Sequence, residues 1–425
     1  MSLVSNLRLM ESFIHYTGLT LQIILWTIFI YYIFISMFAW VKRKEIPASN
    51  FKPVSRFAVL VAAHNEEKVI SNIVHSLKCL KYPKELYDIF VIADNCSDNT
   101  AAIASKCGAK VCERFDPVKR GKGFSLEWMF KKIFEMEVKY DAVCVLDADN
   151  LVSPNFLMEM NKQLCMGHKV IQGYLDSKNP SDSWISGNNS IAFWVSNRLF
   201  QLPRYYLGLS CVLGGTGFVV ATSVLKEFGW GATCLTEDLE FSLRLVMRGM
   251  KVYWSHEAVI YDEKPLTIAQ SWRQRKRWMQ GHFDCMRRFF RKLLLKALHD
   301  KDMVAFDSAL YLLQPLLVVI NGISLIVGLI AMTLNLVSGG FMSLDTVLWS
   351  MFIIALLYFN VVFVFMEGKM TGKVLKYIIT FPVYNLTWVP IVISGFKDRD
   401  KREWVHTLHT RAMDINEVET LENAG

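Results

Sequence analysis

Residues 142–149 read AVCVLDAD, an apolar run that ends in two aspartates separated by one residue. Short, uninterrupted apolar runs are typical of strands that are buried on both faces of a sheet. Three further runs of this kind lie upstream, at 57–63, 89–94 and 109–115, and helix-like windows separate them at 66–80, 99–107 and 121–138. Strands that alternate with helices predict an α/β fold with a mostly parallel sheet flanked by helices.

Polar side chains follow the first two strands, at the edge where parallel sheets bind their ligands. His64 and Glu66 follow the first strand, and Asp94 ends the second. Turn and helix-cap chemistry explains Asn65 and Asp98 without any ligand, because Asn and Asp accept hydrogen bonds from free N–H groups. Two interpretations remain for Asp94. It could stabilise the turn in the same way, or, at the end of a buried strand, it could accept a hydrogen bond from a base or a ribose.

Two later segments have the chemistry of a diphosphate site. Lys119–Gly123 places three cations around two glycines at the start of a helix, which can surround a phosphate, although a solvated loop is the alternative. Asp147 and Asp149 would repel each other unless a cation lay between them or water dispersed their charge. Oxygen ligands of this kind suit Mg²⁺ or Mn²⁺, which can also bridge a diphosphate.

Three more polar motifs follow: Gly214–Gly217 (GGTG), Thr236–Asp238 (TED) and Gln274–Trp278 (QRKRW). Thr236 suits a helix N-cap and acids suit the first helical turn, so a structural role explains the second motif equally well. The cations and the indole of the third motif have a nucleic-acid patch as their rival interpretation. Nucleic-acid binders rarely have such a cluster between a catalytic-looking sheet and apolar helices, so no nucleic-acid partner is expected.

The apolar content exceeds that of a soluble domain. Hydrophobic residues make up 52% of the 425 residues, against roughly 45–50% in soluble proteins, and the mean hydropathy is +0.26. Four apolar segments account for the excess, at 19–41, 309–337, 347–366 and 377–396. About 20 apolar residues suffice to span a bilayer as a helix. We therefore expect a transmembrane helix at 19–41 and a cluster of membrane helices at 309–396, with the proline-interrupted segment 377–396 re-entrant or interfacial.

Charges and cysteines indicate that the central region is cytoplasmic. Basic residues follow the first span at 42–44, whereas the loop 338–346 contains neither Lys nor Arg, as the positive-inside rule expects of an external loop. The nine cysteines form no C-x-x-C pair, which fits free thiols in a reducing compartment. Basic and apolar residues at helical spacing over 283–297 predict an interfacial amphipathic helix, so the lipid bilayer explains part of the net charge of +8.

In order along the chain, Asp94, Asp147–Asp149, Thr236–Asp238 and Gln274–Trp278 resemble the signatures of membrane-embedded, processive glycosyltransferases of family 2. That group includes cellulose, chitin, hyaluronan and poly-N-acetylglucosamine synthases, and its Q-(Q/R)-x-R-W motif matches the last signature. The resemblance covers about residues 54–278 and implies a GT-A-like fold inserted between transmembrane helices. It also implies transfer from a UDP-sugar to a growing β-linked polysaccharide, with UDP-N-acetylglucosamine the best candidate by similarity to the shorter members.

The resemblance implies roles for individual residues. The donor would be bound by Ala62, His64, Glu66, Asp94, Lys122 and Asp147. Mg²⁺ or Mn²⁺ would be bound by Asp149 with Asp147, and the acceptor site would be lined by Gly215, Thr216, Gly217 and Trp278. Asp238, next to Glu237, would be the general base that accepts the proton of the acceptor hydroxyl. The departing UDP would be stabilised by Arg277 and Arg275, which follow Gln274 in the motif.

The chain then divides into six parts: a short N-terminal segment (1–18), a transmembrane helix (19–41), a cytoplasmic glycosyltransferase domain (54–263), the Q-x-x-R-W motif with interfacial amphipathic helices (264–308), a membrane helix cluster (309–396) and a charged C-terminal tail (397–425). Within the tail, Trp404 and His409-Thr410-Arg411 are similar to short C-terminal motifs of some synthases.

Two alternative functions remain open. Only one span precedes the catalytic region, where several members of the family have two. The first alternative is therefore a single transfer to a lipid or short acceptor. If the product is a polysaccharide, an accessory subunit could complete the export channel. The chain could also be a nucleotide-binding membrane scaffold without catalysis. The intact Asp149, Asp238, Arg277 and Trp278 argue against that second alternative.

Overall fold

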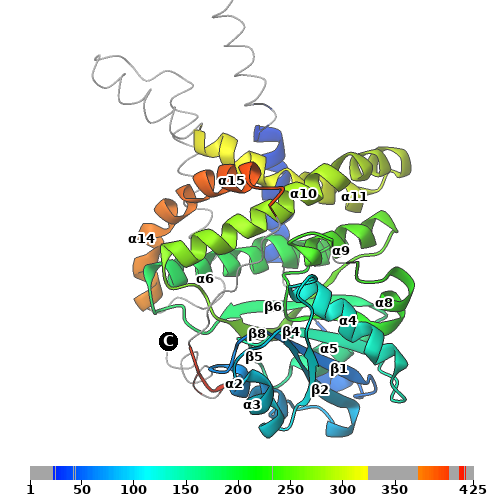
Figure 1. The fold of residues 1–425 in the computed structure, drawn as a ribbon. Helices are drawn as coiled ribbons and strands as arrows, with labels where there is room; N and C mark the ends of the chain where they lie inside the picture. The colour runs from blue at the N-terminus through cyan, green and yellow to red at the C-terminus, as the bar shows by residue number, and fades with distance from the viewer. Residues whose placement is uncertain are drawn as a thin grey trace, which may run out of the picture.

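The structure is a computed structural model that describes residues 23, 25–41, 43, 45–231, 233–323, 372–401, 411–415 and 417. One eight-stranded sheet forms its centre, in the order β3-β2-β1-β4-β7-β6-β8-β5 (Figure 1). The strands are β1 (Phe57–Ala63), β2 (Tyr87–Asp94), β3 (Lys110–Arg114), β4 (Ala142–Asp147), β5 (Leu151–Val152), β6 (Val170–Ser177), β7 (Phe218–Ala221) and β8 (Tyr253–Asp262).

The first four strands form the parallel half of the sheet, as predicted. β1 pairs in parallel with β2 and β4, and β2 pairs in parallel with β3. The connecting helices are α2 (Ile70–Lys78), α3 (Thr100–Lys106) and α4 (Lys122–Glu135). α2 begins later than the predicted 66–80, because the N–H groups of Glu66 and Glu67 donate to Thr100, at the start of α3, and to Asp98, in the loop before it, and these bonds hold the stretch as a turn.

The other half of the sheet is mixed. β7 pairs antiparallel with β4 and β6, β6 pairs in parallel with β8, and β5 pairs antiparallel with β8. Four of the seven pairings are therefore parallel, and the predicted mostly parallel sheet is confirmed. The helices that accompany these strands are α5 (Phe156–Cys165), α6 (Trp184–Ser196), α7 (Leu202–Leu207), α8 (Thr222–Phe228) and α9 (Glu237–Met247).

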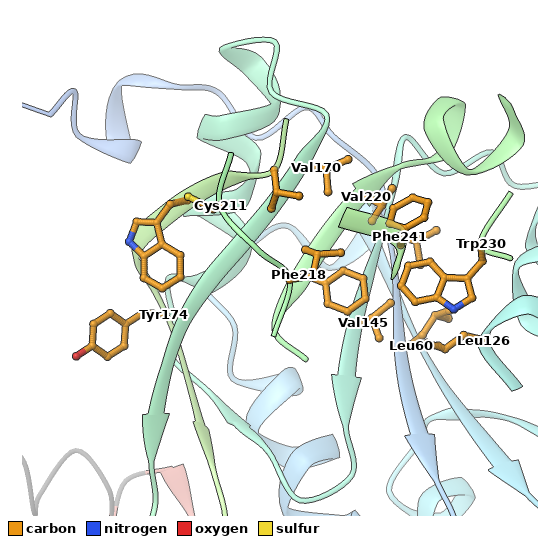
Figure 2. Close-up of a cluster of buried hydrophobic side chains, with 14 of the residues drawn as sticks. Leu60, Leu126, Val145, Val170, Tyr174, Cys211, Phe218, Val220, Trp230 and Phe241 are labelled. Carbon is orange, nitrogen blue, oxygen red and sulfur yellow. The ribbon is translucent and has the colours of Figure 1, made fainter. Parts of the chain in front are cut away.

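Alternate residues of each strand fill two hydrophobic cores on opposite faces of the sheet, as the two-residue period of a strand requires. On β1, Leu60 lies in one core, and Val59 and Val61 lie in the other. Figure 2 shows the first core, in which Trp230 stacks on Phe218 with 5.8 Å between ring centroids. Because apolar side chains cover both faces of the sheet, the polar side chains that could bind a ligand lie at the ends of the strands.

A layer of long helices covers one end of the sheet (Figure 1). α10 (Ile268–Asp300) contacts α9, α11 (Met303–Leu312) and α15 (Trp388–Lys397), and α14 (Gly372–Leu386) contacts α6. α10 contains both the QRKRW motif and the predicted amphipathic segment in one continuous helix. Part of the apolar stripe of that segment packs against protein, with Leu293 and Ala297 in one core with Leu243 and Ala309. Its place at a bilayer surface stays a prediction.

Among the described residues, one helix is long and apolar enough to cross a membrane, Val374–Lys397. A second qualifies if Met303–Leu312 and Gln314–Ile323, bent by 48° to each other, count as one span, and the apolar helix Leu25–Trp40 is shorter. The start of the predicted first span and most of the predicted cluster, residues 324–371, lie outside the described residues. The multi-pass arrangement and the re-entrant path of 377–396 therefore stay predictions.

Candidate active site

A pocket of about 330 Å³ lies between the carboxyl ends of β1, β2 and β4 and the helices α4, α9 and α10. Most of the predicted site residues line it, although they are far apart in the sequence. They are Ala62, His64, Glu66, Asp94, Lys122, Asp147, Asp149, Gly215, Thr216, Glu237, Asp238, Gln274, Arg277 and Trp278. The other two predicted residues, Gly217 and Arg275, lie elsewhere.

Polar contacts fix the side chains at the ends of β1 and β2. The His64 Nδ1 atom lies 2.6 Å from the Asp94 carbonyl oxygen, and the Arg114 guanidinium donates to the Asp94 carboxylate at 2.6 Å. Burial raises the pKa of Asp94, and Arg114 offsets part of that rise. Sequence reasoning missed Arg114, because a single Arg at the end of a strand has no motif around it.

The structural interpretation of Asn65 and Asp98 is confirmed. Asn65 has a φ of 55° and accepts the Ser97 N–H at 2.8 Å. Asp98 accepts the N–H groups of Thr100 and Glu67 at 3.0 and 3.1 Å. Both side chains therefore hold the two strand-end turns against each other.

The start of α4 faces the pocket. Gly121 precedes the helix with a φ of 110°, and residues 120–123 line the cavity. The Lys122 ammonium contacts the Asp147 carboxylate and donates to the Gly215 carbonyl oxygen at 2.7 Å. A helix N-terminus beside two cations suits an anion. Lys119 and Arg120 are exposed, as the alternative of a solvated loop expects, and the phosphate contact stays a prediction.

Two neighbouring side chains brace the turn after β4. The Asp147 N–H donates to both Asn150 Oδ1 and Thr216 Oγ1 at 3.0 Å. Asp149 accepts from the Asn150 side chain at 3.2 Å and from the Glu263 N–H at 3.0 Å. Asn150, Thr216 and Glu263 therefore fix the two aspartates at the cavity wall. The sequence had predicted an acceptor contact for Thr216 and no role for the other two.

The glycines of the GGTG motif have different surroundings. A Cβ at Gly217 would come within 2.6 Å of the Ile260 side chain, and its φ is 64°. Gly217 therefore lets the chain pass close to β8 behind the pocket wall, and its predicted acceptor contact is wrong. Gly215 does face the pocket, where a Cβ would lie 3.3 Å from the Asp238 carboxylate. Its acceptor role stays a prediction.

Carboxylates outnumber cations around the pocket. Three permanently charged cations line it, Arg120, Lys122 and Arg277, together with eight carboxylates: Glu66, Asp94, Asp147, Asp149, Glu237, Asp238, Asp262 and Glu263. Arg114, Lys264 and Lys178, which lie behind the lining, pair with Asp94, Asp262 and Glu263 and neutralise part of this acidic charge. A metal cation beside the remaining carboxylates would reduce their repulsion of an anionic ligand. Mg²⁺ commonly keeps several waters and binds one or two carboxylates together with substrate phosphates. Asp147 and Asp149 fit such a shared site, and the described part of the chain has no group of three or more His, Cys, Asp or Glu side chains able to hold a metal ion.

Glu237 and Asp238 form a carboxylate pair at the start of α9. Both side chains are partly exposed toward the pocket and otherwise enclosed by protein. Burial and the charge of Asp238 raise the pKa of Glu237 to about 7. Burial also raises the pKa of Asp238, while the Leu239 N–H, which donates to its carboxylate at 2.8 Å, stabilises the ionised form. Thr236 occupies the predicted N-cap position of α9, but its side chain makes no capping hydrogen bond and lies against Gly281 of α10.

α10 presents only part of the QRKRW motif to the pocket. Gln274, Arg277 and Trp278 lie about one helical turn apart and line the cavity. The centroid of the Trp278 ring lies 6.3 Å from that of Phe193, in an edge-to-face arrangement. Large aromatic faces next to polar groups suit the apolar face of a sugar ring.

Arg275 faces away from the pocket, so its predicted contact with a departing phosphate is wrong. Its side chain is fully buried, and its Nη1 donates to Thr387 Oγ1 at 3.0 Å. The guanidinium lies 4.5 Å from the Tyr384 ring centroid and 4.9 Å from that of Trp388. These three residues lie where α14 ends and α15 begins, so Arg275 attaches that junction to α10.

We expect Arg275→Met to destabilise the folded protein by about 2 kcal/mol, because a desolvated cation–π contact is worth roughly that much. The affinity of the folded protein for UDP should stay within about twofold of the wild type, whereas Arg277→Met should lower it. Thermal unfolding and calorimetric titration with UDP test both expectations. A large loss of UDP affinity in folded Arg275→Met protein would restore the role first predicted.

The rim of the pocket includes residues that sequence reasoning did not single out. Glu263 lines the pocket directly after β8, and its carboxylate accepts the Arg411 N–H at 3.0 Å. The Arg411 carbonyl in turn accepts from Lys178 at 3.2 Å. The start of the described segment 411–415 therefore lies beside the site, while Trp404, His409 and Thr410 lie outside the described residues.

Three relatives align with somewhat less than two thirds of the chain. They are a probable glycosyltransferase YdaM of Bacillus subtilis (26% identical over 278 residues, 61% of this chain and 64% of that protein), a β-monoglucosyldiacylglycerol synthase of Trichormus variabilis (26% over 272 residues, 60% and 56%) and a poly-β-1,6-N-acetyl-D-glucosamine synthase of Staphylococcus epidermidis (27% over 280 residues, 61% and 62%). The chain therefore matches less than two thirds of the length of each of these relatives.

The fold also matches a solved structure. The mannosyltransferase PcManGT of Pyrobaculum calidifontis, in complex with GDP-Man and Mn²⁺, superposes with a TM-score of 0.58 at 14% identity, covering 90% of this chain and 97% of that chain. At this identity the match concerns the fold alone, and it confirms the expected GT-A-like architecture. Residues 53–281, more than half of the chain, match the model of the family described as glycosyltransferase like family 2. The protein therefore belongs to glycosyltransferase family 2 and is an enzyme of that class.

Proposed function

We propose that this enzyme transfers a sugar, with inversion, from a UDP-sugar to a growing β-linked polysaccharide at the cytoplasmic face of a membrane. UDP-N-acetylglucosamine is the best candidate donor. The proposal rests on the single pocket in which the Glu237–Asp238 pair, the two aspartates after β4, and the cations Lys122 and Arg277 meet.

The uridine of the donor would lie at the ends of β1 and β2. His64 and Glu66 line that end of the pocket, and Arg114 fixes Asp94 so that its carboxylate can accept a hydrogen bond from the base. The diphosphate would lie by the N-terminus of α4, within reach of Lys122. Asp149 and Asp147 would hold Mg²⁺ or Mn²⁺, and the ion, when bound, would neutralise the diphosphate and favour its departure.

Asp238 would accept the proton of the acceptor hydroxyl as that oxygen attacks the anomeric carbon. The bond to the acceptor oxygen forms on the side opposite UDP while the bond to UDP breaks, so an α-linked donor gives a β linkage. Arg277 would stabilise the negative charge that develops on UDP. The rings of Trp278 and Phe193 would hold the acceptor sugar in the pocket.

A single transfer to a lipid acceptor is the second candidate function. The name of one relative denotes synthesis of a glucosylated diacylglycerol, and the name of another denotes synthesis of a poly-N-acetylglucosamine. Exposed apolar side chains on α14 and α15 favour a lipid surface close to α10, among them Ile379 at 82% exposure and Val383 at 58%. With either acceptor, the bilayer is a partner of the enzyme. An accessory export subunit would be needed only if this chain alone does not form the channel for the polymer.

Product analysis distinguishes the two acceptors. The full-length protein would be placed in vesicles with and without diacylglycerol and given UDP-sugar labelled in the sugar. The proposal expects label in long, water-soluble chains that grow without diacylglycerol. Label that is found only in the organic phase, and only when diacylglycerol is present, would overturn the polysaccharide assignment in favour of the lipid acceptor.

The pH dependence of transfer should identify which carboxyl group is the base. Asp238 has the lower ordinary pKa and a stabilising N–H, so it should ionise before Glu237, whose pKa is about 7. The base must be ionised, so kcat/KM should rise with pH along a limb that lies below pH 7. Glu237→Gln should leave that limb in place. A limb centred near pH 7 that disappears in Glu237→Gln would make Glu237 the base.

A further inference from the structure

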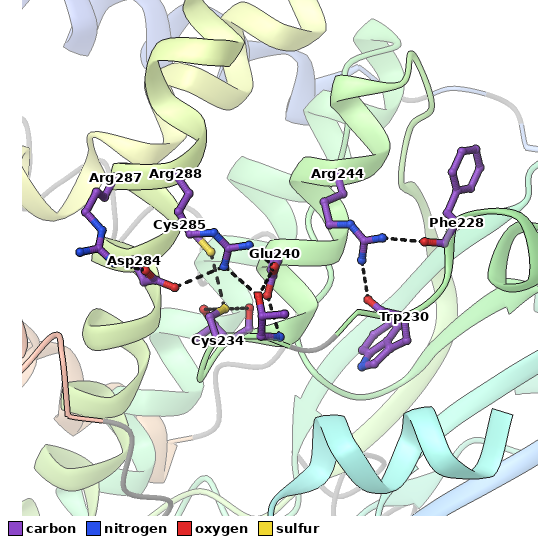
Figure 3. A network of polar contacts seen from close by, with 11 residues as sticks. Phe228, Trp230, Cys234, Glu240, Arg244, Asp284, Cys285, Arg287 and Arg288 are labelled. Atoms are coloured by element: carbon purple, nitrogen blue, oxygen red, sulfur yellow. Dashed lines mark hydrogen bonds and ion pairs between the residues drawn. The ribbon is translucent and has the colours of Figure 1, made fainter. Parts of the chain in front are cut away.

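The proposed transfer needs two helices in a fixed mutual position, because Asp238 lies on α9 and Arg277 lies on α10. Displacing a catalytic group by about 1 Å can cost about 10²-fold in rate. Figure 3 shows a polar network between these helices and the loop that precedes α9, described at residues 229–231 and 233–236. This network lies outside the groups to which the proposed chemistry assigns a role.

Glu240 lies at the centre of the network. Its side chain is 2% exposed and accepts hydrogen bonds from the Thr233 N–H at 3.1 Å and the Thr233 hydroxyl at 2.6 Å. It also accepts from Arg288 of α10 at 2.5 Å. Arg288 donates in addition to the Thr233 hydroxyl at 2.9 Å and to Asp284 at 3.3 Å. One carboxylate thus joins α9, α10 and the loop.

The same loop forms part of the pocket wall. Residues 233–236 line the cavity, and the loop is held again at its start, where Arg244 of α9 donates to the carbonyl oxygens of Trp230 and Phe228, each at 2.6 Å. Near its end, the Cys234 thiol lies 3.8 Å from that of Cys285 on α10. A shift of α10 relative to α9 would therefore also move the pocket wall.

The contact between the Thr236 side chain of the loop and Gly281 of α10 leaves little room for adjustment. A Cβ at Gly281 would lie 2.3 Å from the Thr236 hydroxyl, so any other residue there would force the two segments apart. Thr236 directly precedes Glu237 and Asp238, and Gly281 follows Trp278 by three residues. The position of the carboxylate pair is thus coupled to the position of the motif on α10.

We propose that Glu240 and Arg288 are positioning residues, whose ion pair fixes the distance between the base Asp238 and the cation Arg277 on the neighbouring helix. The inference rests on the proposed function. It assigns neither residue a contact with the substrate. It expects loss of the pair to lower the rate of transfer while leaving the binding of UDP at the ends of β1 and β2 unaffected.

Glu240→Gln is the variant that tests this role. Glutamine keeps the volume and still offers an oxygen and a donor to Thr233, so the fold should persist, but the charge that holds Arg288 is lost. Arg288→Met removes the same pair from the other side, and the double variant tests whether the two act together. Lys296→Met is the matched control, because Lys296 forms its ion pairs with Asp300 and Asp302, at the far end of α10.

Three measurements on the full-length protein test whether Glu240 and Arg288 position the two helices. They are kcat of transfer, affinity for UDP, and amide hydrogen exchange of residues 229–238. We expect kcat to fall by about 10- to 100-fold in Glu240→Gln, with UDP affinity within about twofold, faster exchange in 229–238, and no further loss in the double variant. Lys296→Met should match the wild type in all three.

The outcomes separate the two proposals. A wild-type protein that releases no UDP from any UDP-sugar would overturn the proposed function. An active wild type whose kcat is unchanged by Glu240→Gln would overturn only the positioning role, as would unchanged exchange in 229–238. A parallel loss of kcat and UDP affinity would also overturn it, since it would indicate general unfolding of the pocket.

Discussion

Asp238→Asn should lower the rate of sugar transfer by about 10³-fold while the protein still binds UDP. A positioned general base contributes roughly 10²- to 10⁴-fold to a rate, and an amide cannot accept the proton of the acceptor hydroxyl. The substitution keeps the shape of the side chain, and its amide oxygen can still accept the Leu239 N–H that now bonds to Asp238 at 2.8 Å. UDP release in the presence of acceptor measures the rate, and calorimetric titration measures UDP binding.

Glu237→Gln is the matched control for this prediction, because it removes the neighbouring carboxylate from the same helical turn. It should retain far more activity than Asp238→Asn. If Asp238→Asn turned over at the wild-type rate, the base assignment would be wrong. If Asp238→Asn lost UDP binding as well, Asp238 would be needed for the pocket rather than for the proton transfer.

Asp149→Ala should abolish the metal-dependent part of donor binding. Asp149 is fixed at the pocket wall by Asn150 and by the Glu263 N–H, so its loss removes a pre-oriented oxygen ligand. Removal of even an outer-shell partner commonly costs about 10- to 100-fold in metal affinity, and loss of a direct ligand should cost at least as much. Titration with UDP in the presence of Mn²⁺, Mg²⁺ or a chelator should therefore give the same weak affinity for the variant in all three.

Asp88→Asn provides the control for a general effect of removing an aspartate. Asp88 lies on β2 outside the pocket and pairs with Lys110 at 2.7 Å. Metal should strengthen UDP binding in this variant as in the wild type. Full metal-dependent affinity in Asp149→Ala would contradict the metal role of Asp149 and leave Asp147 or Glu263 as the candidate ligands.

Local pattern was sufficient to predict the parallel half of the fold. The strands β1, β2, β3 and β4 and the helices between them all lie close to their predicted positions. β1, β2 and β4 are buried on both faces and therefore have continuous apolar sequences, whereas β3 is a partly exposed edge strand. The sequences of β6 and β8 contain polar residues within their apolar stretches, and β7 has only four residues, so the pattern did not predict these strands. β6 pairs with β8 across about 80 residues of chain, with a register shift between Gly173 and Tyr174, and such pairing is set by tertiary contacts.

The candidate site was predictable where motifs follow strands and less so on helices. Asp94, Asp147 and Asp149 all line the pocket, because parallel strands end at one edge of the sheet. In the QRKRW motif, however, Arg275 and Arg277 look alike in the sequence and face opposite ways in the structure. Which face of α10 meets the pocket depends on where the junction of α14 and α15 packs, more than 100 residues later.

The residues that hold the site's carboxylates in place were not predicted, for a related reason. Asn150 and Arg114 act by contacting other polar side chains, Asn150 with Asp149 and Thr216, and Arg114 with Asp94. Asp94 lies 20 residues before Arg114, and Thr216 lies 66 residues after Asn150, so these two contacts depend on the fold and not on sequence neighbours. Gly217 shows the converse, since its place in a motif indicated a ligand contact whereas the close approach of Ile260 explains it.

Release of nucleoside diphosphate by the purified full-length protein tests whether the pocket transfers sugar from a UDP-sugar with Asp238 as the base. The protein would be given Mn²⁺ or Mg²⁺ and, in separate reactions, UDP-N-acetylglucosamine, UDP-glucose and GDP-mannose, with Asp238→Asn run in parallel. We expect metal-dependent release of UDP from at least one UDP-sugar, with none from GDP-mannose and almost none from Asp238→Asn. Release from GDP-mannose alone, or equal release by Asp238→Asn, would contradict it.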